Sequence, residues 1–299
     1  MSDARTTPAA LLAEPPLRAL LRLAAPTTAV MSVAALQQVL STYFVSHLGS
    51  VAIAAVSLVL PITLILTTMV GGGIGSGISS AVARALGAGR VHEARQIAEH
   101  GFALTLGLAV VFTGGALLFE RPLFSAMGGS GEVLEVALSV AQIVFAGLGV
   151  GFFVATCDSI LRGSGNVRLP AICSTISLLS QMALTPVLMF GLGWGIRGAP
   201  AAVIFGQLIG VVPRLPHLFG ARAAVRSRLW PRALHGASLA AILSVGVPAS
   251  LGTLINYFGV IALTAVMARY GTAELAAYGL GSRFDFVLMT ICYGTGVAV

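Results

Sequence analysis

Two acidic side chains lie inside strongly apolar stretches of this 299-residue chain, Asp158 and Asp285. A charge inside a bilayer is unfavourable by about 2.5–3.5 kcal/mol on insertion scales, so an acid retained there is a candidate carrier of a proton or a cation. Asp285 comes about twelve residues into its stretch, roughly 18 Å along a helix and hence near the middle of a membrane. Either it carries an exchangeable proton, or it forms a structural pair with an arginine or an amide elsewhere.

Asp158 stands near the end of its apolar stretch, four residues before Arg162. Opposite charges at this spacing lie on the same face of a helix and form a local ion pair. The spacing therefore favours a structural pair between Asp158 and Arg162 over a role of Asp158 in relaying the coupling ion.

The glycine-rich stretch VGGGIGSGISSAVARALGAGR, residues 70–90, raises the question of a phosphate-binding loop. A dinucleotide fingerprint needs G-x-G-x-x-G/A, but Gly71-x-Gly73 is followed by Ser76. A P-loop needs a lysine, and the sequence contains none. The stretch is better explained as part of a membrane helix, where small residues let a neighbouring backbone approach closely. Static packing is favoured over a flexible bend.

Composition supports a membrane protein, because the chain is 57% hydrophobic and only 9% charged, whereas soluble domains carry about 25% charged residues. Runs of about 20 apolar residues predict transmembrane helices. No cleavable signal peptide is evident, so the first run is expected to stay as a helix. The eight predicted spans cover residues 19–46, 51–83, 97–119, 133–161, 169–190, 196–220, 237–268 and 273–299.

The arginines predict the topology of these spans. Thirteen arginines lie at the N-terminus or after spans two, four and six, and only three lie in the alternate loops. Arg214 is counted here with the arginines after span six. A basic excess marks the cytoplasmic side, so the N-terminus is predicted to be cytoplasmic. The predicted organisation is a cytoplasmic segment (1–18), a six-helix first lobe (19–220), a basic inter-lobe loop (221–236) and an incomplete second lobe of two helices (237–299).

A shift of the chain by 222 positions reveals an internal repeat. Pro26 then falls on Pro248, and HLGSVAIAAVSL (47–58) falls on RYGTAELAAYGL (269–280). Six spans separate equivalent points, so the two copies have the same orientation in the membrane. Transporters place their sites near the midplane between such repeats. If the repeat is real, the second copy lacks about four spans, and the chain is expected to be truncated in its second lobe.

Several motifs together resemble the multidrug and toxic compound extrusion family of cation-coupled exporters. They are HLGSVAIAAVSL (47–58), SAVARALGAGR (80–90), ILRGSGNVRLP (160–170), FGLGWGIRGAP (190–200) and GVPASLG (246–252). The resemblance implies an all-helical integral membrane fold with two six-helix lobes. It also implies export of amphipathic, often cationic, organic compounds in exchange for protons or sodium ions. By this resemblance the chain comprises a first lobe and two helices of the second.

Three positions depart from the family pattern. Acidic residues that many members carry are replaced here by Ser41, Thr185 and Asn256. In contrast, GSRFD (281–285) resembles a family context that carries an acid, which supports Asp285 as the ion-coupling residue. The neutral replacements keep polarity, and with three further polar side chains they are the predicted lining of a substrate cavity: Gln37, Ser41, Gln181, Thr185, Asn256 and Tyr257. Hydrogen bonding between helices is the alternative for each of them.

The remaining reactive side chains show no catalytic or metal-binding pattern. Cys157, Cys173 and Cys292 lie in apolar stretches and are expected to be small packing residues, and the five histidines are expected to be solvated or interfacial. We therefore expect no enzyme, no cofactor beyond the coupling ion, no nucleic-acid partner, and a bacterial inner-membrane location. Two alternatives stay open: a fragment that does not transport, and a flippase for lipid-linked precursors. The flippase would need a basic cavity deep in the first lobe, where the sequence shows no arginine.

Overall fold

The computed structural model describes residues 16–220, 225, 227–231 and 235–270, and within them it contains helices and connecting turns but no strand. This confirms the predicted all-helical fold class. Residues Gln37–Gly259 form one compact unit, which holds all the contacts described below. Residues 1–36 and 260–299 make up the other unit, of which the structure describes parts of two helices.

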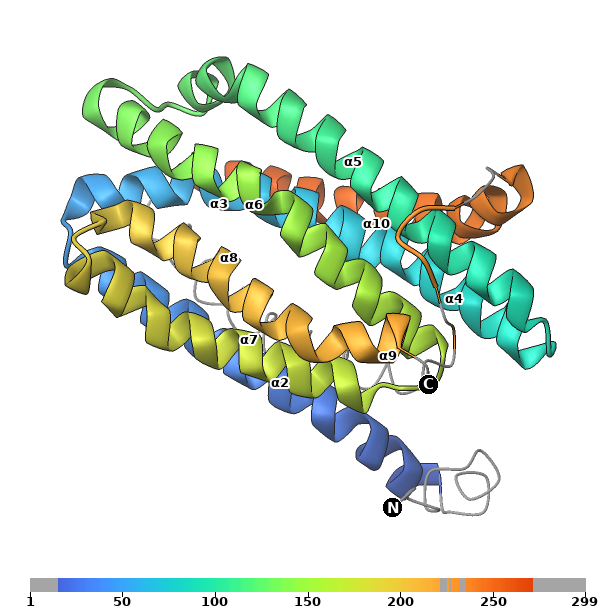
Figure 1. Cartoon of the computed structure of the whole chain (residues 1–299). Coiled ribbons are helices and arrows are strands. Elements are labelled where there is room, and N and C mark those ends of the chain that lie inside the picture. Colours follow the sequence, from blue (N-terminus) through green and yellow to red (C-terminus); the bar gives the residue numbers. More distant parts are fainter. Residues whose placement is uncertain (1–15, 221–224, 226, 232–234, 271–299) are drawn as a thin grey trace. The chain divides into compact units, whose positions relative to one another are not determined.

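The elements include two π-helical segments, which continue neighbouring α-helices, and two short 3₁₀ segments. In chain order they are α2 (Pro16–Ser46), α3 (Ser50–Thr68), η2 (Met69–Ile74), α4 (Gly75–Gly87), α5 (Val91–Ala126), α6 (Gly131–Gly163), α7 (Arg168–Pro186), η3 (Val187–Gly191), η4 (Gly195–Arg197), α8 (Gly198–Val211), η5 (Val212–Arg214), α9 (Leu215–Phe219) and α10 (Gly236–Tyr270). Figure 1 shows them in sequence colours.

The predicted spans agree with these helices. Spans one to seven each coincide with a described helix or helix series, and span eight, 273–299, lies outside the described residues. The largest difference is span three, predicted as 97–119 and observed as Val91–Ala126, because polar first and last turns continue the apolar helix. Within the described part of the chain, six helices are long and apolar enough to cross a membrane, and Val30–Ser46 is a shorter apolar segment.

Glycines with positive φ end three of the helices in the same way, at Gly89 after α4, Gly128 after α5 and Gly165 after α6. Gly89 and Gly165 both adopt positive φ, 73° and 85°. After each of them the next amide donates back across the last turn, Arg90 to the carbonyl of Ala85 and Asn166 to that of Leu161. This is the Schellman arrangement, which satisfies carbonyls left open at a helix end. It turns the chain sharply enough for α4–α5 and α6–α7 to return as neighbours.

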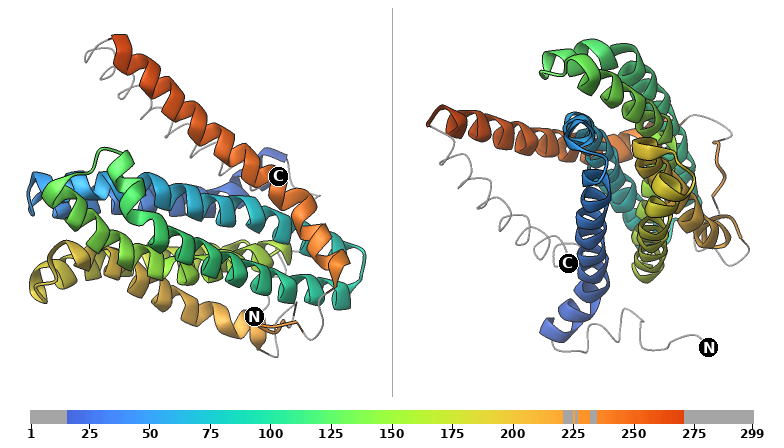
Figure 2. Two further views of the ribbon diagram at one scale, coloured as in Figure 1. Left: turned by 90° about the horizontal axis from the view of Figure 1, so that it is seen from above. Right: turned by 90° about the vertical axis from the view of Figure 1, so that its left-hand side faces the viewer.

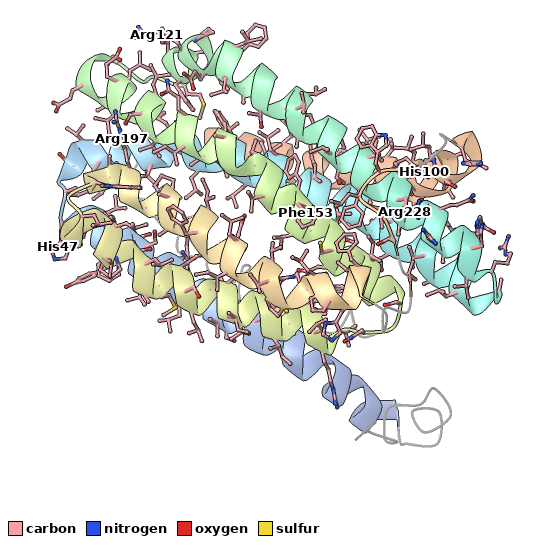
Figure 3. The ribbon with its side chains drawn as sticks, in the orientation of Figure 1. His47, His100, Arg121, Phe153, Arg197 and Arg228 are labelled. Carbon is pink, nitrogen blue, oxygen red and sulfur yellow. The ribbon has the colours of Figure 1, made fainter. Side chains whose placement is uncertain are left out.

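Successive connections lie at alternate ends of the helices. In Figure 3, Arg121 and Arg197 lie at the same end as His47, whereas His100 and Arg228 lie at the opposite end. The helices therefore cross back and forth as the arginine pattern requires. Which of the two ends is cytoplasmic stays a prediction.

The apolar core of the unit lies where α5 and α6 pack together and against the α3–α4 segment (Figure 2). One cluster joins α4, α5 and α6 around Ile78, Ile97 and Ile160. The other joins α3, α5 and α6 around Phe124 and Phe145, whose rings stack at 6.5 Å. These helices form the scaffold on which the polar groups are placed.

The glycine-rich stretch is helical and closely packed, which confirms the packing interpretation. A Cβ on Gly73 would lie 2.7 Å from Cα of Ser250, and one on Gly77 would lie 2.8 Å from the amide nitrogen of Gly246 in α10. Gly75 faces the opposite neighbour, since its Cβ would lie 2.6 Å from Oγ of Ser159 in α6. The glycines therefore let the helix touch α6 and α10 at backbone distance.

Candidate functional site

A face of α7 carries four polar side chains at helical spacing. Ser174, Ser177, Gln181 and Thr185 are separated by three or four residues, so they lie one above the other on the same side of the helix. Three of them are almost fully buried: Ser177 is 5% exposed, Gln181 6% and Thr185 3%. We call these four residues the polar face of α7.

Small residues on α8 make room for this polar face. Gly198, Ala202, Gly206 and Gly210 recur every four residues, and all are buried. A Cβ on Gly206 would collide with Cγ of Gln181, and one on Gly210 would collide with Oγ of Ser177. The polar side chains of α7 therefore occupy the space that side chains on α8 would otherwise fill, which brings the two helices close together.

The same four-residue repeat ends in a buried cation, Arg214. Its side chain has 0% exposure, and Nε lies 2.7 Å from Oδ1 of Asp158 in α6. Nη2 donates to the other carboxylate oxygen at 3.1 Å and to Oγ of Ser174 at 3.0 Å, while Nη1 donates to the carbonyl of Gly210. One guanidinium thus connects α6, α7 and α8 at the end of the polar face.

Two predictions about these charges are wrong. The predicted partner of Asp158 was Arg162, but the ion pair is made by Arg214. Arg214 was also counted with the loop after span six, but it lies in η5, five residues before the end of that span, and its side chain is fully buried. The i,i+4 rule predicted Arg162 because it applies only to residues on the same helix, whereas Arg214 is 56 residues away on another helix. The four-residue repeat from Gly198 to Arg214 could have indicated this burial, because it places Arg214 on the same face as the small residues of α8.

The buried ion pair of Asp158 and Arg214 has no net charge, but both partners need hydrogen bonds to be stable in the interior. The attraction between two buried charges offsets the free energy of their desolvation only when hydrogen bonds also satisfy both partners. Here the guanidinium holds both carboxylate oxygens and also binds a hydroxyl and a carbonyl. By contrast, the hydroxyl of Ser177, one turn further along the polar face, is buried and has no hydrogen-bond partner in the part of the chain that the structure describes.

The structure brings only some of the predicted cavity residues together. Gln181 and Thr185 share the polar face, and the Thr185 hydroxyl donates to the Gln181 carbonyl at 2.7 Å. Gln181 packs against Gly206 of α8, Thr185 is buried, and neither lines the cavity described below. Gln37 and Ser41 lie one turn apart on α2 and are half-buried. Their role in substrate binding stays a prediction.

Asn256 and Tyr257 lie on α10, away from the polar face. Asn256 is exposed, whereas the Tyr257 hydroxyl lies 3.3 Å from Oγ1 of Thr68 at the end of α3. This contact is a polar link between spans two and seven. Asp285, the main predicted ion-coupling residue, lies outside the described residues, so its role is likewise a prediction.

One histidine departs from its expected environment. His100 in α5 is 1% exposed, whereas a solvated or interfacial side chain was expected. Its Nε2 accepts the backbone amide of His235 at 2.8 Å, and its Nδ1 lies 2.7 Å from the carbonyl of Gln96. Since an amide can only donate and a carbonyl can only accept, the ring is neutral, with its proton on Nδ1. Among the described residues, no cluster of histidine, cysteine and acidic side chains could hold a metal ion.

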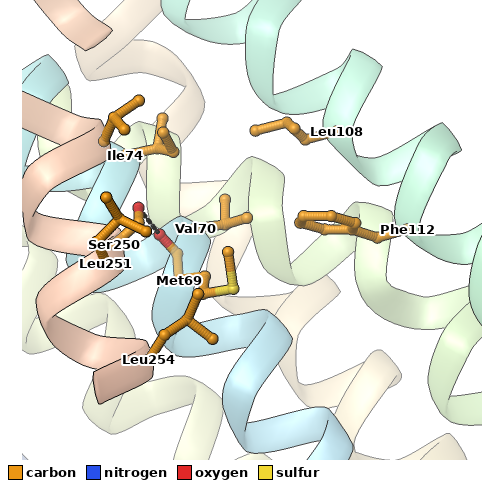
Figure 4. Close-up of a pocket in the computed structure, with 9 residues that line it drawn as sticks. Met69, Val70, Ile74, Leu108, Phe112, Ser250, Leu251 and Leu254 are labelled. Atoms are coloured by element: carbon orange, nitrogen blue, oxygen red, sulfur yellow. Dashed lines mark hydrogen bonds between the residues drawn. The ribbon is translucent and has the colours of Figure 1, made fainter. Parts of the chain in front are cut away.

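A cavity of about 170 Å³ lies elsewhere in the unit, between span two, α5 and α10 (Figure 4). Met69, Val70 and Ile74 of the π-helical segment form one wall, and Leu108 and Phe112 of α5 form another. None of the predicted site residues that the structure describes lines it.

The third wall of this cavity belongs to α10 and comprises Val247, Ser250, Leu251 and Leu254. Ser250 brings the sole hydroxyl, which donates to the carbonyl of Met69 at 3.1 Å and lies 2.8 Å from that of Gly246. The lining is therefore apolar, and its polar atom is already engaged in hydrogen bonds.

Comparison with known proteins agrees with this architecture. The chain is 28% identical to an FAD transporter of Shewanella oneidensis over 84% of its length and 56% of the relative's, and 23% identical to the multidrug export protein MepA of Staphylococcus aureus over 86% and 58%. It is similar to a structure described as the outward-facing conformation of a multidrug resistance MATE family transporter of the MOP superfamily. That similarity has a TM-score of 0.88, 30% identity, and coverage of 96% of this chain and 64% of the other.

The chain spans just over half the length of the curated relatives it matches. The sequence model of the MatE family matches residues 26–187, which is more than half of the chain. With its multi-pass helical architecture and the relatives above, the chain belongs to the MatE family of membrane transporters, the multidrug and toxic compound extrusion family.

Proposed function

We propose that the protein is a secondary active antiporter of the bacterial inner membrane. It exports amphipathic organic compounds, often cations, in exchange for protons or sodium ions, by alternating access between two lobes. The observation that carries this proposal is the family match over α2 to α7, the helices that include the buried polar face. The N-terminus is assigned to the cytoplasm on the arginine distribution.

The two acids differ as candidates for ion coupling. Asp158 is held by two of the three guanidinium nitrogens of a buried arginine, so it would have to release Arg214 before it could bind another cation. We therefore assign the exchangeable ion first to Asp285 and keep Asp158 as the second candidate. For Gln181 to contact substrate, α7 would have to separate from α8, because its side chain packs against Gly206; Thr185 is buried as well and would also have to become exposed.

A second candidate substrate follows from one relative. One relative is named as a transporter of FAD, which is a dinucleotide, and the match covers 84% of this chain and 56% of the relative. Export of a dinucleotide is therefore the alternative to export of amphipathic cations. The lipid-linked flippase is less favoured, because the buried arginine that the unit does contain is neutralised by Asp158.

Efflux from energised membrane vesicles tests the proposal. Ethidium and FAD are loaded separately, and their efflux is followed under an imposed pH gradient and then a sodium gradient. Since the chain spans just over half of its relatives, the 299-residue chain is compared with a version extended to their length. Gradient-driven ethidium efflux is expected, and transport of FAD alone would favour the alternative.

The assignment of ion coupling to Asp285 is tested with one variant and one control. Asp285→Asn should abolish the gradient dependence, whereas Glu132→Gln, which neutralises an exposed carboxylate at the start of α6, should leave it intact. Full gradient-driven efflux from Asp285→Asn would rule out Asp285 as the coupling residue.

A further inference from the structure

The cavity between span two, α5 and α10 lies at the middle of three membrane-spanning segments. Met69–Ile74 is at the centre of the span Ser50–Gly87, and Leu108 and Phe112 are near the centre of Val91–Ala126. The α10 wall begins about eleven residues into its helix, roughly 16 Å from the start at 1.5 Å per residue. All three walls therefore lie at the depth of the hydrocarbon core.

The α10 wall of this cavity includes side chains that are exposed in the described part of the chain. Two of its lining residues are substantially exposed, Val247 at 44% and Leu251 at 52%. The exposed apolar stripe continues along the same face to Ile255 and Phe258, at the spacing of successive helical turns. Within the described residues, the cavity therefore borders an exposed apolar surface.

The wall of the cavity is built by a local departure from the α-helix. The π-helical segment widens the turn at Met69–Ile74, and the Met69 carbonyl accepts a hydrogen bond from Ser250 of the neighbouring helix (Figure 4). Single π-helical turns inside α-helices occur frequently at functional sites. An apolar occupant would make dispersion contacts with the side chains that line the cavity.

We propose that this cavity binds an acyl chain of a bilayer phospholipid. A cavity of 150 Å³ lined by apolar side chains binds one benzene molecule, so about 170 Å³ accommodates one ring or a short stretch of chain. The depth decides between these occupants. An amphipathic cation bound here would place its charge close to the membrane midplane, which is unfavourable. Among the described lining residues, the side-chain hydroxyl of Ser250 is already hydrogen-bonded and does not compensate that charge. An acyl chain reaches this depth with its headgroup still at the interface.

Photolabelling in membranes tests the proposal without relying on transport. The protein is reconstituted with phospholipids that carry a diazirine either near the end of an acyl chain or next to the glycerol, and the labelled residues are mapped by mass spectrometry. The chain-end probe should label Met69–Ile74 and residues 247–254, and this labelling should saturate at a low ratio of probe to protein. The glycerol-proximal probe should not label them.

A matched pair of variants separates the cavity from the general lipid surface. Leu108→Trp fills the void from α5, whereas Val110→Trp adds the same bulk two residues away, where the side chain is 68% exposed. Labelling of Met69–Ile74 should fall several-fold in Leu108→Trp and persist in Val110→Trp. Val247→Trp, at the exposed rim, should produce the same loss if Leu108→Trp fails to fold.

Three results would overturn the proposal. Labelling that does not saturate and is unaffected by Leu108→Trp or Val247→Trp would show ordinary lipid contact. Absence of label at Met69–Ile74 would show that the cavity is closed to lipid. Competition of the label by ethidium, but not by unlabelled phospholipid, would assign the cavity to an exported compound.

Discussion

The guanidinium of Arg214 binds both carboxylate oxygens of Asp158, at 2.7 and 3.1 Å, across 56 residues of sequence. The pair fixes the end of α8 to α6, and its contact with Ser174 adds α7 to the same point. Since three spans meet at one buried charge pair, this contact is a structural anchor of the first lobe.

Removing the cation should destabilise the protein strongly. Arg214→Met leaves the Asp158 carboxylate buried without its partner, which typically costs about 3–5 kcal/mol. Thermal unfolding in detergent should show a large drop in the midpoint. The double variant Arg214→Met, Asp158→Asn should recover part of the loss, because no unpaired charge stays buried.

The comparison for this variant is Arg121→Met. Arg121 also pairs with a carboxylate, Glu135 at 2.6 Å, but both side chains are more than 60% exposed. An exposed pair contributes about 0.2–1 kcal/mol, so the midpoint should hardly move. Equal effects of Arg121→Met and Arg214→Met would contradict the anchoring role. If Asp158→Asn changed the ion dependence of transport more than expression, the relay role of Asp158 would be favoured instead.

The architecture was predictable because hydropathy over twenty residues is a local property of the chain. The spans follow from it directly. The alternation of the arginines and the small residues of the glycine-rich helix are likewise visible in short stretches of the sequence. The partners were not predictable in this way. Arg214 meets Asp158, and Gly73 meets Ser250, only after separate spans have packed, and the sequence rules used for pairing look no further than one helical turn. The π-helical turn at Met69–Ile74 also depends on a neighbour, since Ser250 binds the Met69 carbonyl.

The contact between α4 and α10 should be sensitive to a single methyl group. A Cβ on Gly77 would lie 2.8 Å from the amide nitrogen of Gly246 and closer still to the carbonyl of Ile242, both backbone atoms that cannot rotate away. Gly77→Ala should therefore push α10 from α4 and lower the unfolding midpoint. Gly107→Ala meets nothing within 4 Å and should be neutral or stabilising by up to about 1 kcal/mol, since alanine favours a helix over glycine. A loss in Gly107→Ala as large as in Gly77→Ala would refute the steric explanation.

The hydrogen bond between His100 and the amide of His235 should be visible in hydrogen exchange. His100→Phe keeps an aromatic ring but removes the acceptor, so the His235 amide should exchange faster while helix α5 stays protected. His217→Phe provides the control, because His217 is exposed and its ring contacts the carbonyl of Pro213 in the adjacent segment η5. Unchanged exchange at His235 in His100→Phe would show that this bond does not hold the start of α10.

Site-specific labelling should establish which end of the helices faces the cytoplasm. Arg90 and Arg121 lie at the two ends of α5, and their side chains are 61% and 63% exposed. With a cytoplasmic N-terminus, Arg121→Cys should react with a membrane-impermeant maleimide in intact cells, whereas Arg90→Cys should react only after permeabilisation.

The native thiols allow this experiment with little background. Cys157 and Cys173 have 0% exposure in the apolar interior, so neither should react until the protein is denatured. Cys292 lies beyond the described residues and is replaced by serine in every variant. The helices cross back and forth, so one orientation of α5 determines that of its neighbours. If Arg90→Cys reacted in intact cells and Arg121→Cys did not, the predicted orientation would be inverted and the arginine-rich loops would lie outside.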